Sequence, residues 1–438
     1  MDLTNAIAQW MLSQIETMPA DLGRSLSRIK PHLLLDLVLS DREAAEVRAL
    51  LDQPPSDHPR KATVFIPGIM GSQLSSVRGI SAPLWLNPQV LLDGHLNLLD
   101  LDDDGVSDRS PDVDIMPLGI EKLTYLQIIL TLARETRLYE FPYDWRHSIC
   151  RTADILAASL ERWAIAAPER RFTLIGHSMG GLVARAYLAR HPRQAERRVE
   201  RVIMLGTPLQ GAPEAALLFV GEAMASRQLR HLNPNNDVVS FASNLPSVYQ
   251  LLPPPPELLY GSDGYPCDWD LYDARAWGLE QLRADLLADA LAFHKQVRRR
   301  QPDIEQIELA GCHSETIIGV HREVGDDGSP VLVPEYQAQG PNSGDEQVPL
   351  WSTTLPEVTT YYVEMSHNAL VQTGPALDAV LALLHDDPVM LPTTVPPVSE
   401  KRRPFVTIPL VQQMNEVRRH LAAGRLSRED LRRIFFTG

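Results

Sequence analysis

The sequence contains few cysteines, and they are widely spaced. Only three occur in 438 residues, at Cys150, Cys267 and Cys312. A disulfide framework or a cysteine-ligated metal cluster needs sets of thiols at characteristic spacings, which an odd number of distant cysteines does not provide. The composition favours a reducing compartment, so we expect a cytoplasmic protein, and no motif implies a metal or an organic cofactor.

Positive charge is also scarce. The chain has 41 Lys and Arg residues against 56 Asp and Glu residues, which gives a formal net charge of -15. Such a balance opposes binding to nucleic acid and gives no general attraction to an anionic membrane. We therefore expect no nucleic-acid partner, and any contact with lipid must depend on a local apolar surface.

The sequence has no hydrophobic run long enough to cross a bilayer. The apolar stretch Leu33 to Leu39 is interrupted by Asp36 and is far shorter than the ~20 residues that a spanning helix needs. The N-terminus, Met1 to Asn5, has no basic segment of the kind that opens a secretory signal peptide. These features predict a soluble, unexported protein whose contact with a membrane surface is peripheral and transient.

Short apolar segments alternate with longer segments of helical spacing along most of the chain. The predicted strands are at 62–66, 173–175, 201–205, 304–309, 316–320 and 359–363. The predicted helices are at 123–134, 153–166, 181–190, 281–299 and 376–385. This alternation predicts an α/β protein with a mostly parallel central sheet and helices on both faces.

Composition divides the chain into three parts. We expect a helical N-terminal extension at residues 1–54, an α/β domain at 60–386, and a Pro-rich linker with a basic helical tail at 387–438. Within the domain, about 78–119 and about 209–265 exceed a minimal α/β unit, and long loops of this kind usually form caps, lids or binding surfaces. The terminal helices leave open a protein partner or self-association, and the tail could dock on a membrane or on the chain's own acidic surface.

The segment FTLIGHSMGGLVARAYLAR, from Phe172 to Arg190, places Ser178 on a strand-to-helix turn. Residues typical of a strand precede Gly176, and apolar residues at helical spacing follow Gly180. Glycines on both sides of a serine let strand and helix pass closely, and the helix N-terminus favours developing negative charge. This is the setting of a nucleophile elbow, so we predict Ser178 as a nucleophile rather than a serine in an ordinary turn.

A nucleophilic serine needs a histidine base and an acid that orients the histidine, in the chain order Ser, Asp or Glu, His. His367 follows the last predicted strand and is the preferred base. Its rivals are His313, His321 and His385. Asp345 lies in a turn one strand upstream of His367 and is the preferred acid. Asp326 and Asp327, in a similar turn, stay open as alternatives.

Acyl transfer also needs two backbone N–H donors for the oxyanion that forms at the reacting carbonyl. The residue after the nucleophile, Met179, is predicted to supply one of them. The second is predicted at Ile69, in the glycine turn that follows the first strand. Met70, beside Ile69, is predicted to contribute to the apolar wall that receives the acyl chain.

Six motifs occur in the order and approximate spacing of the lecithin:cholesterol acyltransferase and lysosomal phospholipase family. They are PGIMGS at 67–72, FPYDWR at 141–146, GHSMGG at 176–181, LGTPLQG at 205–211, GDEQVP at 344–349 and SHNAL at 366–370. The chain resembles this family from about Ala62 to Leu384, and FPYDWR is the most discriminating motif. The resemblance implies an α/β-hydrolase fold with Ser178, Asp345 and His367 as its triad.

The resemblance also implies that Ile69 and Met179 bind the oxyanion. It further implies that Leu84, Trp85 and Leu86 lie in a cap that meets lipid, and that part of 209–265 forms a lid. One family trait is missing, because secreted members carry cysteine pairs that brace the cap and lid, whereas no cysteine lies between positions 65 and 150 here. An extracellular or lysosomal setting is therefore not implied.

These observations predict a serine-dependent acyl-ester hydrolase that acts on lipids. The first interpretation is a phospholipase A-type activity through an acyl-enzyme at Ser178, with phospholipid as the substrate. In a second interpretation, an O-acyltransferase passes the same acyl group to a lipid alcohol instead of water. In a third, a partner binds the terminal helices of a membrane-damaging lipase effector, as in a defence or toxin system.

Overall fold

A computed structural model of the protein describes residues 61–398, except 79–81, 86, 167–169, 262–263, 326–329, 339, 341 and 373, together with residues 419–420. The helical extension predicted at 1–54 lies outside the described residues. Most of the tail predicted within 387–438 also lies outside the described residues. The N-terminal extension and the tail therefore stay predictions.

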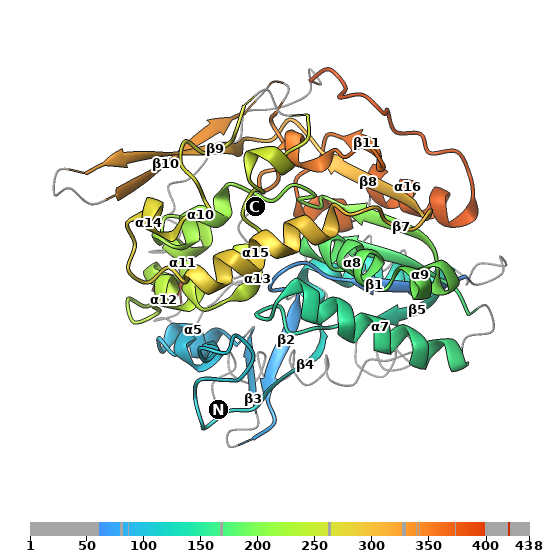
Figure 1. Ribbon diagram of the computed structural model, residues 1–438. Coiled ribbons are helices and arrows are strands. Elements are labelled where there is room, and N and C mark those ends of the chain that lie inside the picture. Colours follow the sequence, from blue (N-terminus) through green and yellow to red (C-terminus); the bar gives the residue numbers. More distant parts are fainter. Residues whose placement is uncertain are drawn as a thin grey trace.

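A six-stranded parallel sheet forms the centre of the described structure (Figure 1). Its strands are β1 (Ala62–Ile66), β5 (Arg137–Glu140), β6 (Phe172–His177), β7 (Val199–Leu205), β8 (Glu305–Gly311) and β11 (Thr359–Val363). They lie in the order β11-β8-β7-β6-β1-β5, and every neighbouring pair is parallel. The chain order reverses at β1, with β5 on one side and the later strands on the other. Ligands of such open sheets bind at this switch point, outside the carboxyl ends of the strands.

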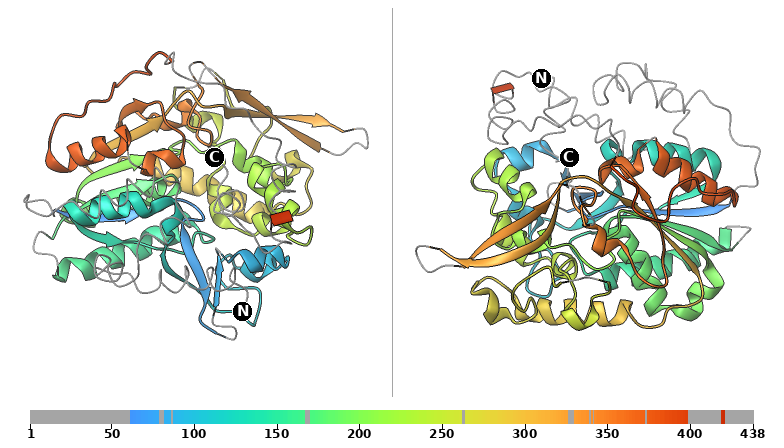
Figure 2. Two further views of the ribbon diagram at one scale, coloured as in Figure 1. Left: turned by 180° about the vertical axis from the view of Figure 1, so that it is seen from behind. Right: turned by 90° about the horizontal axis from the view of Figure 1, so that it is seen from above.

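Helices cover both faces of this sheet (Figure 2). Val64 and Ile66 of β1 pack into an apolar cluster with α7 (Ile149–Ala166) and α8 (Met179–Arg190). Phe65, which points to the other face, packs into a second cluster with α6 (Lys122–Glu135) and α16 (Pro375–His385). Strands buried on both faces need apolar residues on both sides, which explains their continuous hydrophobic runs. The predicted α/β architecture, a mostly parallel central sheet with helices on both faces, is confirmed.

The other helical segments of the described residues lie mostly in the connections between strands. The α-helices are α5 (Pro88–Leu92), α9 (Pro192–Arg198), α10 (Glu214–Leu218), α11 (Met224–Leu232), α12 (Val238–Ser243), α13 (Pro246–Gln250), α14 (Ala274–Trp277) and α15 (Ala284–Val297). The 3-10 helices are η1 (Leu96–Leu99), η2 (Pro256–Leu258), η3 (Leu350–Thr353) and η4 (Asn368–Val371). Within the described ranges, no helix combines the length and apolar character needed to cross a membrane.

Two insertions occupy the segments predicted as cap and lid. The first contains a small antiparallel sheet of β2 (Ser72–Ser76), β3 (Ala82–Trp85) and β4 (Ile115–Ile120) in the order β3-β2-β4, together with α5 and η1. The second contains α10 to α13 and η2. The two are joined by hydrogen bonds from the Asn233 and Asn236 side chains to backbone oxygens of α5 (both 2.8 Å). The cap and lid limits stay predictions.

The strand predicted at 316–320 is present, but it does not belong to the central sheet. It forms β9 (Thr316–Val324), whose strand partner among the described residues is β10 (Pro330–Gln337), in an antiparallel hairpin. The hairpin projects from the body of the protein, and the views in Figures 1 and 2 agree on this. A bridge between Cys267 and Val320 ties β9 to the body, so β10 is the outer strand.

The FPYDWR motif fastens the first insertion to the turn that follows β1. The backbone N–H of Tyr143 donates to Ser72 Oγ (3.0 Å), and Trp145 Nε1 donates to the Ser72 carbonyl (3.2 Å). The Tyr143 hydroxyl donates to the Pro67 carbonyl (2.9 Å). All three contacts are buried, so the motif fixes both the start of β2 and the turn before it.

The arginine of the same motif is a buried centre of charge. Arg146 is 1% exposed, and its guanidinium donates to Asp144 (2.6 and 2.9 Å), to Asp108 Oδ1 (2.8 Å) and to the Leu99 carbonyl (2.9 Å). Asp108 and Leu99 belong to the first insertion, whereas Asp144 and Arg146 follow β5. The ion pair therefore joins the insertion to the central sheet.

Removing this guanidinium is expected to destabilise the fold strongly. Arg146→Ala leaves the Asp144 and Asp108 carboxylates without their buried partner, so the free energy of unfolding should fall by about 3–5 kcal/mol. Arg109→Ala is the matched control in the same insertion, because Arg109 pairs with the exposed Asp103 and its loss should cost about 0–1 kcal/mol. Urea unfolding measures both, and equal losses would contradict the prediction.

Candidate active site

Ser178 occupies a strained turn between β6 and α8. Its backbone has φ 53° and ψ -127°, a conformation that residues with a side chain rarely adopt. Strain of this kind costs about 1–3 kcal/mol and persists only where neighbouring structure enforces it. The predicted strand-to-helix turn is present, and Ser178 is 8% exposed at the end of the strand.

Two glycines allow this turn to form. A Cβ on Gly180 would lie 2.3 Å from the Ile66 carbonyl oxygen, and one on Gly176 would lie 2.5 Å from the Gly181 nitrogen. Both contacts are with backbone atoms, which cannot move aside without disturbing the sheet. The close passage of strand and helix, inferred above from the glycine spacing, is therefore a feature of the structure.

Asp345 and His367 form a buried hydrogen-bonded pair. His367 Nδ1 lies 2.7 Å from Asp345 Oδ2, and the two side chains are 3% and 1% exposed. The other carboxylate oxygen, Oδ1, accepts hydrogen bonds from the backbone N–H groups of Gln347 (3.1 Å) and Val348 (2.8 Å). The backbone N–H of His367 also donates to the backbone carbonyl of Asp345 (2.7 Å). The carboxylate is thus fixed on both oxygens and the imidazole is fixed through Nδ1.

The residue after β7 connects this pair with the serine turn. A Cβ on Gly206 would lie 2.8 Å from Asp345 Oδ2 and 3.0 Å from His367 Nδ1. The residue before it, Leu205, accepts a hydrogen bond from the backbone N–H of Ser178 (2.9 Å). In the described part of the chain no hydrogen bond joins the Ser178 hydroxyl to His367, and such bonds are often long in ligand-free enzymes. The structure brings Ser178, Asp345 and His367 into one neighbourhood.

The predicted oxyanion turn lies directly beside the serine. A Cβ on Gly68 would lie 3.0 Å from the Ser178 Cβ, and the Gly71 N–H closes the turn on the Gly68 carbonyl (3.1 Å). Among the described residues, the Ile69 N–H donates no hydrogen bond. The Met179 N–H lies at the first position of α8, where a helix supplies no acceptor. Neither predicted donor therefore has an acceptor among the described residues.

The predicted lipid-contacting residues are mostly interior. Leu84 is 3% and Trp85 is 2% exposed, and Trp85 Nε1 donates to the Met70 carbonyl (2.8 Å). Trp85 therefore braces the turn that contains Ile69, while Met70 itself is half-buried with φ 63°. Leu86 lies outside the described residues. Contact of this segment with lipid stays a prediction.

The rival histidines lie in other surroundings. His313 Nε2 is hydrogen-bonded to the Pro396 carbonyl (2.6 Å), and His321 pairs with Glu335 on the hairpin (3.0 Å). His385, at the end of α16, lies 3.6 Å from Glu135. None of these three contacts involves Ser178 or Asp345. The alternative acids Asp326 and Asp327 lie outside the described residues.

Three buried polar residues around the site were not predicted from the sequence. Tyr125 and His177 are hydrogen-bonded to each other behind Ser178 (2.9 Å). Glu308, on β8, is fully buried, and its Oε1 accepts a hydrogen bond from the Thr207 N–H (2.8 Å). Burial, together with the nearby negative charge of Asp345, raises the pKa of the Glu308 carboxyl well above its usual range. Only the position of His177, directly before the serine, offered a signal in the sequence.

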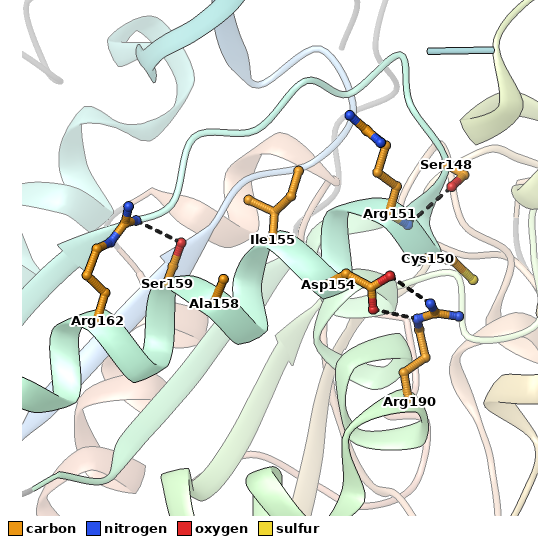
Figure 3. A pocket seen from close by; sticks show the side chains of 9 residues that line it. All are labelled: Ser148, Cys150, Arg151, Asp154, Ile155, Ala158, Ser159, Arg162 and Arg190. Atoms are coloured by element: carbon orange, nitrogen blue, oxygen red, sulfur yellow. Dashed lines mark hydrogen bonds and ion pairs between the residues drawn. The ribbon is translucent and has the colours of Figure 1, made fainter. Parts of the chain in front are cut away.

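A surface groove of about 610 Å³ lies along α7, apart from these residues (Figure 3). Arg151 and Arg162 stand on separate turns of the helix, and Arg190 forms an ion pair with Asp154 (2.7 Å). Ser178, Asp345 and His367 are not among its lining residues. The groove therefore adds nothing to the candidate active site.

Residues 83–275 match the family model described as lecithin:cholesterol acyltransferase. Two proteins of Arabidopsis thaliana align with shorter parts of the chain. Lecithin-cholesterol acyltransferase-like 4 is 36% identical over 78 residues, which are 17% of this chain and 15% of that protein. Phospholipase A(1) LCAT3 is 35% identical over 82 residues, which are 18% of each. The chain thus spans less than a fifth of the length of these relatives.

Similar solved structures are more distant in sequence. The crystal structure of the Tle4-Tli4 complex has 15% identity and a TM-score of 0.45, and the match covers 75% of this chain and 99% of that one. The mature Bacillus licheniformis lipase BlEst2 has 16% identity and a TM-score of 0.40, and the match covers 75% of this chain and 95% of the lipase chain.

The buried Glu308 carboxyl should make stability depend on pH. The folded state keeps a proton that the unfolded chain loses above its ordinary pKa of 4.5, so stability should fall as pH rises beyond that value. Glu308→Gln, which resembles the protonated acid, should flatten this dependence and raise the melting temperature at neutral and alkaline pH. Glu305→Gln, on the exposed end of β8, should leave the dependence as in the wild type. A steeper dependence in Glu308→Gln would contradict the assignment.

Proposed function

We propose that this protein is a serine-dependent acyl-ester hydrolase acting on lipids. The match of residues 83–275 to the lecithin:cholesterol acyltransferase family model supports this proposal. The observation that carries the proposal is the buried His367–Asp345 hydrogen bond of 2.7 Å beside a serine in a strained strand-to-helix turn. Ser178, Asp345 and His367 each follow a strand or hairpin at the same edge of the sheet. The matched family range contains Ser178 and ends before Asp345 and His367.

In the proposed reaction, Ser178 Oγ attacks the ester carbonyl and His367 accepts its proton. Asp345 Oδ1 is occupied by two backbone N–H groups, so Oδ2 is free to accept from the imidazole. A neutral imidazole that donates from Nδ1 has its lone pair on Nε2, which is the atom that takes the serine proton. The Asp345 charge then stabilises the imidazolium without itself taking a proton.

The N–H groups of Ile69 and Met179 stabilise the oxyanion that forms at the carbonyl. Neither group has a hydrogen-bond acceptor in the described residues that it would have to give up. Donors fixed in advance, and held on a helix N-terminus and on a braced turn, need no rearrangement when charge develops. Collapse of this intermediate expels the alcohol, which takes its proton from His367, and leaves the acyl group on Ser178.

The fate of the acyl-enzyme decides between hydrolase and acyltransferase. Water activated by His367 Nε2 gives a free fatty acid, whereas a lipid alcohol in the same position gives a new ester. The family model is named for an acyltransferase and one Arabidopsis relative for a phospholipase A(1) activity, so both outcomes have a precedent. We propose hydrolysis of phospholipid as the first activity and acyl transfer as the second.

Ser178→Ala should abolish lipid cleavage without loss of the fold. Vesicles of mixed phospholipids incubated with wild type should release free fatty acid and lysolipid, which mass spectrometry detects, and the variant should release neither. Ser159→Ala, which removes a buried hydroxyl from α7, is the matched control and should keep wild-type activity. Adding a long-chain alcohol tests for acyl transfer through the appearance of its ester. Equal release by wild type and Ser178→Ala would refute the nucleophile, and cleavage of short acyl esters alone would exclude phospholipid.

Asp345→Asn should impair turnover far more than substrate binding. The amide can present its NH2 group to His367 and thereby favour the tautomer with the proton on Nε2, which cannot accept from serine. By analogy with serine hydrolases that have lost this acid, kcat should fall by about 10⁴-fold while KM changes little. Steady-state kinetics with a short-chain chromogenic ester measures both constants. Asp112→Asn changes an exposed carboxyl of the first insertion and is the control. A similar kcat in Asp345→Asn and Asp112→Asn would contradict the role of Asp345 in orienting His367.

A further inference from the structure

A continuous series of buried hydrogen bonds runs behind Ser178, from the oxyanion turn to the His367 backbone. The Gly68 N–H donates to the Tyr125 hydroxyl oxygen (3.0 Å), which lies 2.9 Å from His177 Nδ1. His177 Nε2 lies 3.2 Å from the His367 carbonyl oxygen. Tyr125, His177 and His367 are each at most 3% exposed, so water does not compete for these bonds.

The chemistry of the groups fixes the direction of every bond in this series. A backbone N–H can only donate, so the Tyr125 oxygen accepts from Gly68 and its own hydrogen is available to His177. Nδ1 of His177 accepts that hydrogen, and a neutral imidazole then carries its proton on Nε2. The Nε2 proton is donated to the His367 carbonyl, which can only accept. Each donor is thereby matched with one acceptor.

This arrangement requires His177 to be neutral, and its surroundings keep it so. Burial lowers the pKa of the His177 imidazole well below its usual range, and the nearby His367 lowers it further. Charging His177 would place a proton on Nδ1, which would then point at the Tyr125 hydroxyl hydrogen and force that hydroxyl to turn away. The neutral state is therefore the one that keeps the series intact.

Ring packing holds the same residues in place. The rings of Tyr125 and His177 meet edge to face with centroids 5.5 Å apart, and Tyr125 meets Phe65 of β1 in the same way at 5.4 Å. The His177 and His367 rings are 4.7 Å apart. Such contacts are worth about 0.5–1.5 kcal/mol each between aromatic rings, beyond the area they bury.

We propose that Tyr125 and His177 are positioning residues, which hold the oxyanion turn and the His367 backbone in register on either side of Ser178. The inference rests on the proposed function, because it assigns the two ends of the series to the oxyanion site and the base. Gly68 directly precedes Ile69, and the His367 carbonyl belongs to the histidine that receives the serine proton. Neither Tyr125 nor His177 touches substrate in this role, so their loss should change turnover rather than binding.

Tyr125→Phe tests the proposal, because it keeps the ring and removes only the hydroxyl. It leaves the Gly68 N–H and His177 Nδ1 without partners and frees both the turn and the histidine backbone to shift. Since small misplacements at a reacting centre cost up to about 100-fold, kcat for a short-chain ester should fall about 10- to 100-fold with little change in KM.

Tyr249→Phe is the matched control for loss of a buried tyrosine hydroxyl. The Tyr249 hydroxyl also accepts from one backbone N–H, of Arg283 (2.9 Å), and donates to one carbonyl, of Ser243 (2.9 Å). It lies on α13 of the second insertion, which packs against α15 and α7, and neither of its two hydrogen bonds involves Ser178, Asp345 or His367. The melting temperature should fall by a similar amount in Tyr125→Phe and Tyr249→Phe. Only Tyr125→Phe should have a lower kcat than wild type.

Two changes at His177 test whether the pair acts as a unit. His177→Gln can still present an amide N–H to the His367 carbonyl and should retain more of the wild-type kcat than His177→Leu. Combining His177→Leu with Tyr125→Phe should cost no more than His177→Leu alone, because the series is already broken.

The outcomes separate this inference from the proposed function. If wild type cleaves no ester, or Ser178→Ala cleaves it equally, the proposed function fails. If wild type is active and Ser178→Ala is not, the inference is overturned by a wild-type kcat in Tyr125→Phe, by an equal loss of kcat in Tyr249→Phe, or by additive losses in the double variant.

Discussion

The parallel hydrogen-bonded ladder of the central sheet is the constraint on which the candidate site depends. Parallel strands all end at the same edge, so Gly68 after β1, Ser178 after β6, Gly206 after β7 and His367 after β11 meet there although they are far apart in the chain. Asp345 reaches the same edge through the turn that follows the β9–β10 hairpin. The chemistry thus uses connections, while the sheet determines where those connections come together.

The sequence predicted the parts of the molecule that depend on local pattern. Runs of β-forming residues marked five of the six strands of the sheet, and helical spacing marked its main helices, because burial on both faces imposes a continuous signal. The serine turn was predicted from the glycines on both sides of Ser178. The backbone contact that requires Gly176 comes from nearby Gly181, whereas the one that requires Gly180 comes from Ile66 on β1 and could not be read from the local pattern. Asp345 and His367 followed from chain order and from their places in loops after predicted strands, and the hydrogen bond between them joins the two residues so selected.

Features that depend on pairing between distant segments could not be predicted. β5 has four residues, all half-buried, and carries no clear period. The segment at 316–320 was read as a strand, but nothing in its residues distinguishes an outlying hairpin from a place in the central sheet. Tyr125 and Glu308 looked like ordinary members of a helix and a strand, because their partners come from other elements. For the same reason, the burial of Trp85 was not foreseen.

The outer strand of the projecting hairpin has a further consequence for how this protein behaves at high concentration. β10 has no strand partner on its outer side among the described residues, and an unpaired edge of this length is a template for sheet growth between molecules. Pro330 and Pro334 interrupt that edge, since proline has no N–H to donate to an incoming strand. The hairpin therefore extends into solvent with Val331 and Tyr336 exposed, and two positions on its outer strand cannot donate a backbone hydrogen bond to a strand of another molecule.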